Sequence, residues 1–217
     1  MPRDSERAAR VPAPLESGGF NGQVELPYGL KSADIRSAMN DFLSFLGFIN
    51  AALSRKKIRR LESLLMPANF SSIVGEFMGA MIPKYCKGIV KNAYHNGHPD
   101  LVPVGCYDNN SCLHGEEGIE IKASRHLSGW QGHNAEDGWL MVFVFENNGP
   151  RDIPGIAPPI PFRFLKVVGA KIAKEDWSFS GRSEKSRRTI TASVTRTGFE
   201  KMDANWIYRA RKSPQGE

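Results

Sequence analysis

Residues 139–145, WLMVFVF, form an uninterrupted apolar run, and this run constrains the fold more than any other segment. Successive side chains of a strand point to opposite faces of a sheet, so a half-exposed strand alternates apolar and polar residues. A run that is apolar at every position instead predicts a central strand that is buried on both faces. We therefore expect a sheet with packing layers on either side of it.

Four further segments are rich in β-branched and aromatic residues and predict strands. They are residues 101–107 (LVPVGCY), 118–124 (GIEIKAS), 162–172 (FRFLKVVGAKI) and 189–196 (TITASVTR). Asn- and Gly-rich segments such as DNNS and ENNG separate several of them, which is typical of turns. Near the end of the chain, residues 203–211 (DANWIYRAR) predict a short helix.

The first half of the chain has a helical period. In residues 32–53, which Ser32 is suited to cap, apolar side chains recur at spacings of three and four: Ile35, Met39, Phe42, Leu46, Ile49 and Leu53. Residues 55–66 predict a second helix or a bent extension that ends at Pro67. A third helix is expected from a cap at Ser71 or Ser72 to about Met81, with Pro83 as its stop.

Helices followed by a strand meander predict a single domain of the α/β or α+β class. The 217 residues, 41% of them hydrophobic, suffice for one domain with a substantial core. We expect a flexible N-terminal arm over residues 1–25, which are charged and rich in Pro and Gly. A single domain would then span residues 26–217.

The sequence contains no run of 18 apolar residues, so no membrane-spanning helix is expected. The N-terminus also lacks the apolar segment of a signal peptide. Three cysteines, Cys86, Cys106 and Cys112, do not suggest a disulfide framework, so we expect a cytoplasmic protein. Neither a phosphate-binding P-loop nor a GxGxxG motif occurs in the sequence. No nucleotide cofactor is therefore expected.

Basic residues are concentrated in one part of the chain. The whole chain carries 29 Lys and Arg against 23 Asp and Glu, a net charge of +6. Residues 151–217 alone contain 14 basic and 7 acidic residues, and RKKIRR at 55–60 adds a second basic cluster. Such asymmetry favours binding to a polyanion, with ordinary solvated charge as the alternative.

Three charged residues suggest a catalytic site. Asp100 follows Pro99 at the start of one expected strand. After a gap of 19 residues, Glu120 and Lys122 lie two apart in the next. Alternation places Glu120 and Lys122 on one face, with Ile119 and Ile121 toward the core. If the strands pair as a hairpin, the two carboxylates can bind Mg²⁺, and the lysine can orient a water that attacks a phosphodiester.

This arrangement of Pro99-Asp100 and Glu120-Ile121-Lys122 resembles the PD-(D/E)xK nuclease superfamily, especially the type II restriction endonucleases. The resemblance covers about residues 70–145 and includes Glu76, on a helix that precedes the Pro-Asp pair. It implies a restriction-endonuclease-like core, a mixed β-sheet flanked by helices, and an enzyme that cuts double-stranded DNA in the cytoplasm of a bacterium or archaeon. Because one site cuts one strand of a palindromic duplex, we also expect a homodimer. Apolar side chains that crowd several faces of residues 32–53 favour an interface there, with packing inside the chain as the alternative. Asp100, Glu120 and the Ile121 carbonyl would hold Mg²⁺, with Mn²⁺ able to substitute, and Lys122 and Glu76 would complete the catalytic set.

Each of these residues has a plainer interpretation. Asp100 could be a turn residue, Glu120 and Lys122 a surface pair, and Glu76 a solvent-facing side chain. A structural zinc site is a further alternative, built from His95, His98, Cys106, Cys112 and His114. Its cysteine spacing does not match a standard zinc knuckle.

Residues expected to contact DNA lie outside the motif. In the basic part at about 180–212, hydroxyl side chains alternate with cations that suit phosphate contacts, namely Arg182, Lys185, Arg187 and Arg188. Gln131 and His133, just after the motif, could approach a phosphate or a base, or lie in an ordinary loop.

Alternative functions are a repair or junction-resolving nuclease, or a basic nucleic-acid-binding protein without catalysis.

Overall fold

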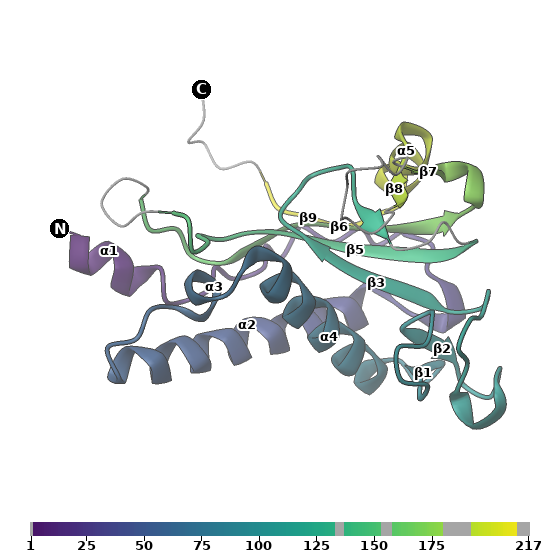
Figure 1. The fold of residues 1–217 in the computed structure, drawn as a ribbon, viewed down its shortest axis with the longest axis horizontal. Helices are drawn as coiled ribbons and strands as arrows, with labels where there is room; N and C mark the ends of the chain where they lie inside the picture. Colours follow the sequence, from purple (N-terminus) through teal and green to yellow (C-terminus); the bar gives the residue numbers. More distant parts are fainter. Residues whose placement is uncertain (1, 133–136, 153–157, 180–191, 212–217) are drawn as a thin grey trace, which may run out of the picture.

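A six-stranded mixed sheet forms the centre of the computed structural model, which describes residues 2–132, 137–152, 158–179 and 192–211 (Figure 1). Its strands lie in the order β1-β2-β3-β5-β6-β9. Their bounds are Ile89–Lys91 for β1, Leu101–Pro103 for β2, Ile119–Ser124 for β3, Gly138–Glu146 for β5, Arg163–Ile172 for β6 and Trp206–Arg209 for β9. The mixed α+β class expected from the sequence is confirmed.

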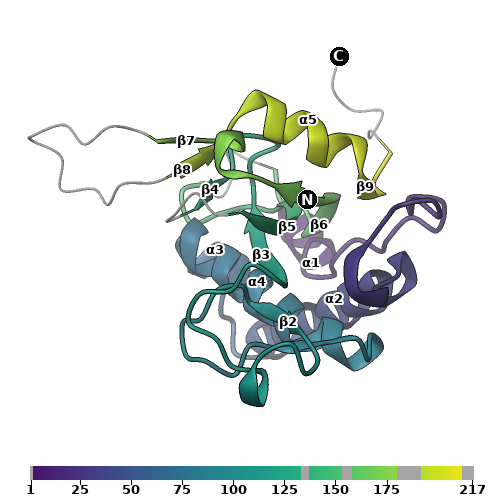
Figure 2. The same cartoon turned by 90° about the vertical axis from the view of Figure 1, so that its right-hand side faces the viewer.

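Helices cover one face of this sheet and a second, smaller layer covers the other. Helices α2 (Ser32–Arg55) and α4 (Pro67–Tyr85) lie on one face, with α1 (Pro2–Ala8) and α3 (Leu61–Leu64) near one end (Figure 1). The other face carries α5 (Arg196–Ala204) and a three-stranded sheet in the order β4-β8-β7 (Figure 2). Its strands are Gln131–Gly132 for β4, Trp177–Phe179 for β7 and Ala192–Val194 for β8; 3₁₀ turns span Pro27–Gly29, Asp108–Asn110 and Lys174–Asp176.

Strand β5 is buried on both faces, as its composition predicts, because a hydrophobic cluster packs against each side. Phe143 and Phe145 belong to the larger cluster, which includes Phe42 of α2 and Phe70 of α4. The smaller cluster lies toward α5 and contains Leu140, Val142 and Val144 of β5 with Trp130, Val194 and Met202. Burial of this one strand therefore joins the two layers of the protein.

Strand β3 has a fully paired edge and a mostly open edge. It runs parallel to β5 through six residue pairs, from Ile119 to Ser124, whereas β2 pairs with it only at Leu101 and Ile119. A parallel pair needs a crossover connection of a dozen or more residues. Here residues 125–137 make the connection and include β4, so the crossover also contributes to the smaller sheet.

Three of the expected helices have different bounds. Helix α4 begins at Pro67 rather than at Ser71 or Ser72, because proline suits the first helical position, where the N–H needs no partner. The helix also continues past Pro83, which lies in the last turn and removes a single hydrogen bond near the helix end. Residues 55–66 contain only the short α3, since Lys57 adopts a φ of 57° and ends the preceding helix.

The N-terminal segment, for which composition predicts a flexible arm, packs against the domain. Ala9 is buried, and the Ala13 N–H donates to the carbonyl of Phe162 at 2.8 Å. Arg60, which is buried, binds both carboxylate oxygens of Glu6 at 3.0 and 3.2 Å and one oxygen of Glu62 at 3.1 Å. Arg60 and Phe162 are distant in sequence from the N-terminal segment, so local composition does not reveal these contacts.

Two predictions for the second half of the chain also need correction. Residues 206–209 form the edge strand β9 rather than part of a helix, in keeping with the strand preference of Trp, Ile and Tyr. Strand β2 ends at Pro103, because Gly105 turns the chain with a φ of 75°. Of residues 189–196, the described part contains β8.

No described helix is long and apolar enough to cross a membrane.

Candidate active site

The candidate site lies at the fork where β2 and β3 separate. The pairing of Leu101 with Ile119 confirms that the strand after Asp100 pairs with the strand that contains Glu120. Beyond this pair the backbone hydrogen bonds between β2 and β3 stop. The Asp100 side chain replaces the next one, because its Oδ2 accepts a hydrogen bond from the N–H of Ile121 at 2.8 Å. Asp100 is thus fixed beside the open edge of β3.

Glu120 and Lys122 share the face of β3 that points away from the larger core, as alternation predicts. Ile119 and Ile121 are buried in that core. Lys122 Nζ lies 2.7 Å from Glu120 Oε1, and His98 Nδ1 lies 3.0 Å from Glu120 Oε2. The side chains of Glu120, Lys122 and His98 are only 20%, 23% and 24% exposed, so these charges interact in a partly desolvated environment.

The two carboxyl groups have pKa values displaced in opposite directions. Burial and the nearby charge of Glu120 raise the pKa of Asp100 from 3.8 to about 7. Burial alone would also raise the pKa of Glu120, but the hydrogen bond with His98 and the charge of Lys122 outweigh it and lower that pKa to about 2. Glu120 is therefore ionised at neutral pH, while Asp100 titrates close to neutrality.

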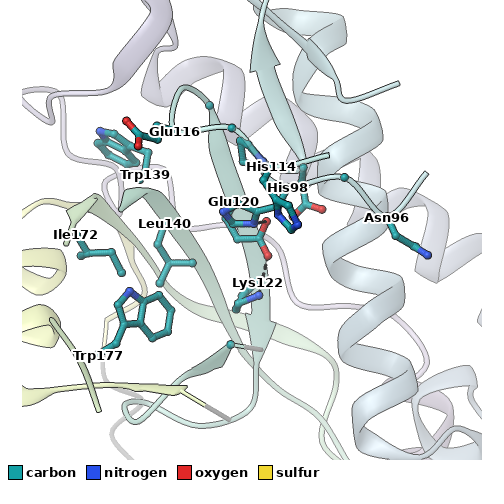
Figure 3. Close-up of a pocket in the computed structure, with 17 residues that line it drawn as sticks. Asn96, His98, His114, Glu116, Glu120, Lys122, Trp139, Leu140, Ile172 and Trp177 are labelled. Atoms are coloured by element: carbon teal, nitrogen blue, oxygen red, sulfur yellow. Dashed lines mark hydrogen bonds and ion pairs between the residues drawn. The ribbon is translucent and has the colours of Figure 1, made fainter. Parts of the chain in front are cut away.

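Two cavities meet at these residues, and both are lined by Asn96, Asp100, Glu120 and Lys122. The first, of about 290 Å³, is named here the base-side cavity. It extends toward the smaller sheet and is also lined by Leu140, Ile172 and Trp177 (Figure 3). The helix-side cavity, of about 520 Å³, lies between β3 and α4, where Ser71 and Gly75 leave space beside the strand. A substrate can therefore reach the three charged residues from either side.

Asp100 and Glu120 are the carboxylates at the fork that could hold a divalent cation. Among the described residues, no three His, Cys, Asp or Glu side chains are placed to hold a metal ion, so the alternative zinc site finds no support. Mg²⁺ needs only one or two carboxylates, since waters and substrate oxygens complete its six positions. Asp100 and Glu120 are close enough for the charge of one to raise the pKa of the other, and a divalent cation would relieve that repulsion.

The Ile121 carbonyl is consistent with a place in that donor set. Within an extended strand, the N–H and C=O of one residue point toward the same neighbouring strand. The Ile121 N–H points to Asp100, so its carbonyl faces the same edge. Two carboxylates and one carbonyl would then lie around the fork.

Glu76 lies near this set without touching it. Its side chain on α4 is 70% exposed and is bound to Lys91 Nζ at 2.7 Å. It lines the helix-side cavity together with Asp100 and Glu120, and its charge contributes to the raised pKa of Asp100. The structure therefore brings together Asp100, Glu120 and Lys122, with Glu76 at the rim.

The residues predicted to contact DNA are mostly beyond the structural description. Gln131 is exposed on β4 and lines neither cavity, although the neighbouring Gly132 lines the base-side one. His133, Arg182, Lys185, Arg187 and Arg188 lie outside the described residues.

Several basic residues of the C-terminal part form ion pairs within the protein, which reduces the charge that they offer to a polyanion. Lys166 and Arg209 both bind Asp203, and Lys201 binds Asp176. Arg163 pairs with Glu146 at 2.7 Å. The positive excess of the C-terminal part therefore depends strongly on the residues at 180–191.

Sequence patterns did not reveal the contact between His98 and Glu120, although the position of His98 directly before Pro99-Asp100 was a usable signal. They also missed the apolar wall of Leu140, Ile172 and Trp177, which comes from three different segments. No local pattern links these segments, because only the folding of β5 against β6 and β7 brings them together.

Comparison of the chain with protein-family models, with curated proteins and with solved structures finds no match.

Proposed function

We propose that this protein is a Mg²⁺-dependent endonuclease that hydrolyses phosphodiester bonds of double-stranded DNA. The observation that carries the proposal is the fork at Asp100, where two carboxylates and the ammonium of Lys122 converge between two cavities. The resemblance of Pro99-Asp100 and Glu120-Ile121-Lys122 to the PD-(D/E)xK pattern supports the same chemistry. A mixed sheet with α4 packed along β3 is compatible with a restriction-endonuclease-like core.

Each residue at the fork has a distinct role in this proposal. Asp100, Glu120 and the Ile121 carbonyl would hold Mg²⁺, which when bound lowers the pKa of a water and offsets the negative charge of the phosphate. Lys122 orients the attacking water and places a positive charge beside the phosphate. Glu120 keeps the Lys122 ammonium in position through their 2.7 Å contact. Partial burial strengthens each of these interactions.

Incubation with a sequenced supercoiled plasmid, in Mg²⁺ and in EDTA, tests the proposal. Linear product in Mg²⁺ alone supports the nuclease, and discrete bands on further digestion indicate a type II restriction enzyme. Nicking or smearing indicates instead a repair or junction-resolving nuclease. DNA binding without any cleavage in Mg²⁺ or Mn²⁺ would leave the non-catalytic binding protein as the better account.

Neutralising Arg187 and Arg188 together is expected to weaken DNA binding, because both are proposed to contact phosphate. The slope of log K against log salt should fall in magnitude by up to about 2, at ~0.9 for each phosphate that the protein no longer neutralises. Fluorescence anisotropy over a salt series measures this slope. Substitution of the ion-paired Arg163 is a suitable comparison, and an unchanged slope in the double variant would show that the two arginines do not contact phosphate.

We also propose a homodimer, because one site cuts one strand and a palindromic duplex presents two equivalent bonds. The apolar side chains that crowd several faces of α2 favour an interface there. The chain itself buries Phe42 and Leu46 and partly buries Leu43, Phe45 and Ile49, so Phe48, 67% exposed, is the main candidate for an interface.

Light scattering at micromolar concentration, without and then with DNA, is expected to give twice the chain mass of 24.1 kDa. Phe48→Ser should then shift the protein toward the monomer, because a buried aromatic anchor contributes strongly to an interface. A 24.1 kDa species under both conditions that still cuts both strands in one binding event would rule the dimer out.

A further inference from the structure

The base-side cavity has two chemically different walls. Glu120 and Lys122 lie on one side with His98, and Leu140, Ile172 and Trp177 lie together on the other (Figure 3). Leu140 and Ile172 are each 2% exposed, whereas Trp177 is partly exposed. The accessible part of the apolar wall therefore includes the indole ring of Trp177, supported from behind by buried aliphatic side chains.

The charge of this cavity does not suit a phosphate. Its described lining contains three carboxylates, those of Asp100, Glu116 and Glu120, against the single ammonium of Lys122. A phosphate placed beyond Lys122, toward the apolar wall, would find no second lysine or arginine among the described lining residues and would share the cavity with Glu116. A neutral aromatic group would instead gain contact with Trp177 and would avoid this repulsion.

The volume of the cavity limits the size of such a group. At about 290 Å³, the cavity has roughly twice the ~150 Å³ that holds one benzene molecule in an engineered protein cavity. A purine or pyrimidine ring fits this space, and a base pair does not. A base within an intact duplex also has both faces covered by its neighbours, so it cannot stack on a protein side chain.

From these observations we propose that the base-side cavity binds one unstacked nucleobase, that of the nucleotide next to the scissile phosphate. This inference rests on the proposed nuclease function and narrows its substrate to DNA with an unpaired base beside the cleavage point, or with a base that the enzyme extrudes. The strand would enter along the helix-side cavity, pass Asp100, Glu120 and Lys122, and place its next base against Trp177. His114 and Glu116, which also line this cavity, are suited to hydrogen bonding with the base edge.

The test compares binding of two short labelled duplexes of the same sequence, one fully paired and one with a single unpaired base, by fluorescence anisotropy in EDTA. The wild-type protein should bind the second duplex about tenfold more tightly, because the unpaired base gains a stacking partner without first breaking a pair. Trp177→Ala should remove this preference by weakening binding of the duplex with the unpaired base. Trp177→Phe should retain most of it, because phenylalanine keeps an aromatic face.

A matched control is Trp206→Ala, since Trp206 lies on the edge strand β9 and lines neither cavity. Thermal melting verifies that each variant is folded. Equal affinity of the wild type for the two duplexes, or a preference that survives Trp177→Ala in folded protein, would overturn the inference.

Cleavage of the same duplexes in Mg²⁺ separates this inference from the proposed function. Cleavage without any preference that depends on Trp177 would overturn the cavity assignment and leave the nuclease intact. A preference that depends on Trp177, without cleavage in Mg²⁺ or Mn²⁺, would overturn the nuclease and retain the cavity as a binding site for an unpaired base.

Discussion

Replacement of Lys122 by alanine is expected to lower the rate of Mg²⁺-dependent DNA cleavage by about a hundredfold or more, the range typical of a group that assists proton transfer. Lys122 Nζ lies 2.7 Å from Glu120 and contributes the single ammonium in the described lining of the base-side cavity. No other described lysine or arginine of that cavity can take its place beside the phosphate. DNA affinity should change only a few-fold, because Lys122 would supply one positive charge beside those proposed to contact phosphates at Arg182, Lys185, Arg187 and Arg188.

Single-turnover cleavage, with enzyme in excess over DNA, measures this effect without interference from product release. Lys84→Ala is a matched control, because Lys84 is exposed in the last turn of α4 and lines neither cavity. Glu120→Ala should be as damaging as Lys122→Ala, since it removes both a proposed metal ligand and the partner of Lys122. Cleavage at the wild-type rate by either variant would show that the motif has been assigned to the wrong residues.

Replacement of Asp100 by asparagine is expected to remove cleavage and at the same time to stabilise the metal-free protein at about pH 8. The pKa of Asp100 is raised from 3.8 to about 7, mainly by burial and by the charge of Glu120. The folded protein therefore binds more protons than the unfolded chain between these values, and this group makes the protein less stable as the pH rises from about 4 to about 7. Above about pH 7 the folded protein bears the full free-energy cost of the buried charge on Asp100.

Asparagine carries no charge at any of these pH values, and its side-chain oxygen can still accept the hydrogen bond from Ile121. The gain in stability at about pH 8 should be on the order of 2 kcal/mol, less than the full pKa displacement implies because Asp100 is partly exposed. This corresponds to a rise in Tm of about 4–8 °C for a chain of this size.

Thermal melting in EDTA at about pH 8 and about pH 5 measures this difference, which should shrink at the lower pH. Asp108→Asn, at an exposed position in a 3₁₀ turn, is the matched control. Mg²⁺ should then raise the Tm of the wild type but not that of Asp100→Asn, since a ligand stabilises only the form that binds it. A lower Tm for Asp100→Asn at both pH values would contradict the proposed repulsion between Asp100 and Glu120.

Local sequence patterns predicted the parts of the fold that depend on local periodicity. The apolar run of β5 indicates a strand that is buried on both faces, and the alternation of β3 indicates one buried face and one polar face. The burial of Phe143 and the shared face of Glu120 and Lys122 could therefore be predicted. The proximity of Asp100 to Glu120 required one further assumption, the pairing of β2 with β3. That pairing is short, and its end at Asp100 creates the fork.

The remaining features depend on contacts between residues that are far apart in the chain. The N-terminal segment is held by Arg60 and by the carbonyl of Phe162, and neither partner can be inferred from a Pro- and Gly-rich composition. Likewise, Trp177 approaches the candidate site only because β7 belongs to a second sheet on the same face as Glu120. Sequence patterns therefore identified the charged residues of the site but not the cavity around them.

Cleavage of a supercoiled plasmid by the wild-type protein and by Glu120→Gln, purified in parallel and incubated in Mg²⁺ or in EDTA, tests the central claim most directly. Glutamine preserves the size of the side chain and removes the charge that holds both Lys122 and the proposed metal. The account predicts linear or nicked plasmid only for the wild type in Mg²⁺. Equal cleavage by Glu120→Gln, or wild-type cleavage that persists in EDTA, would contradict it.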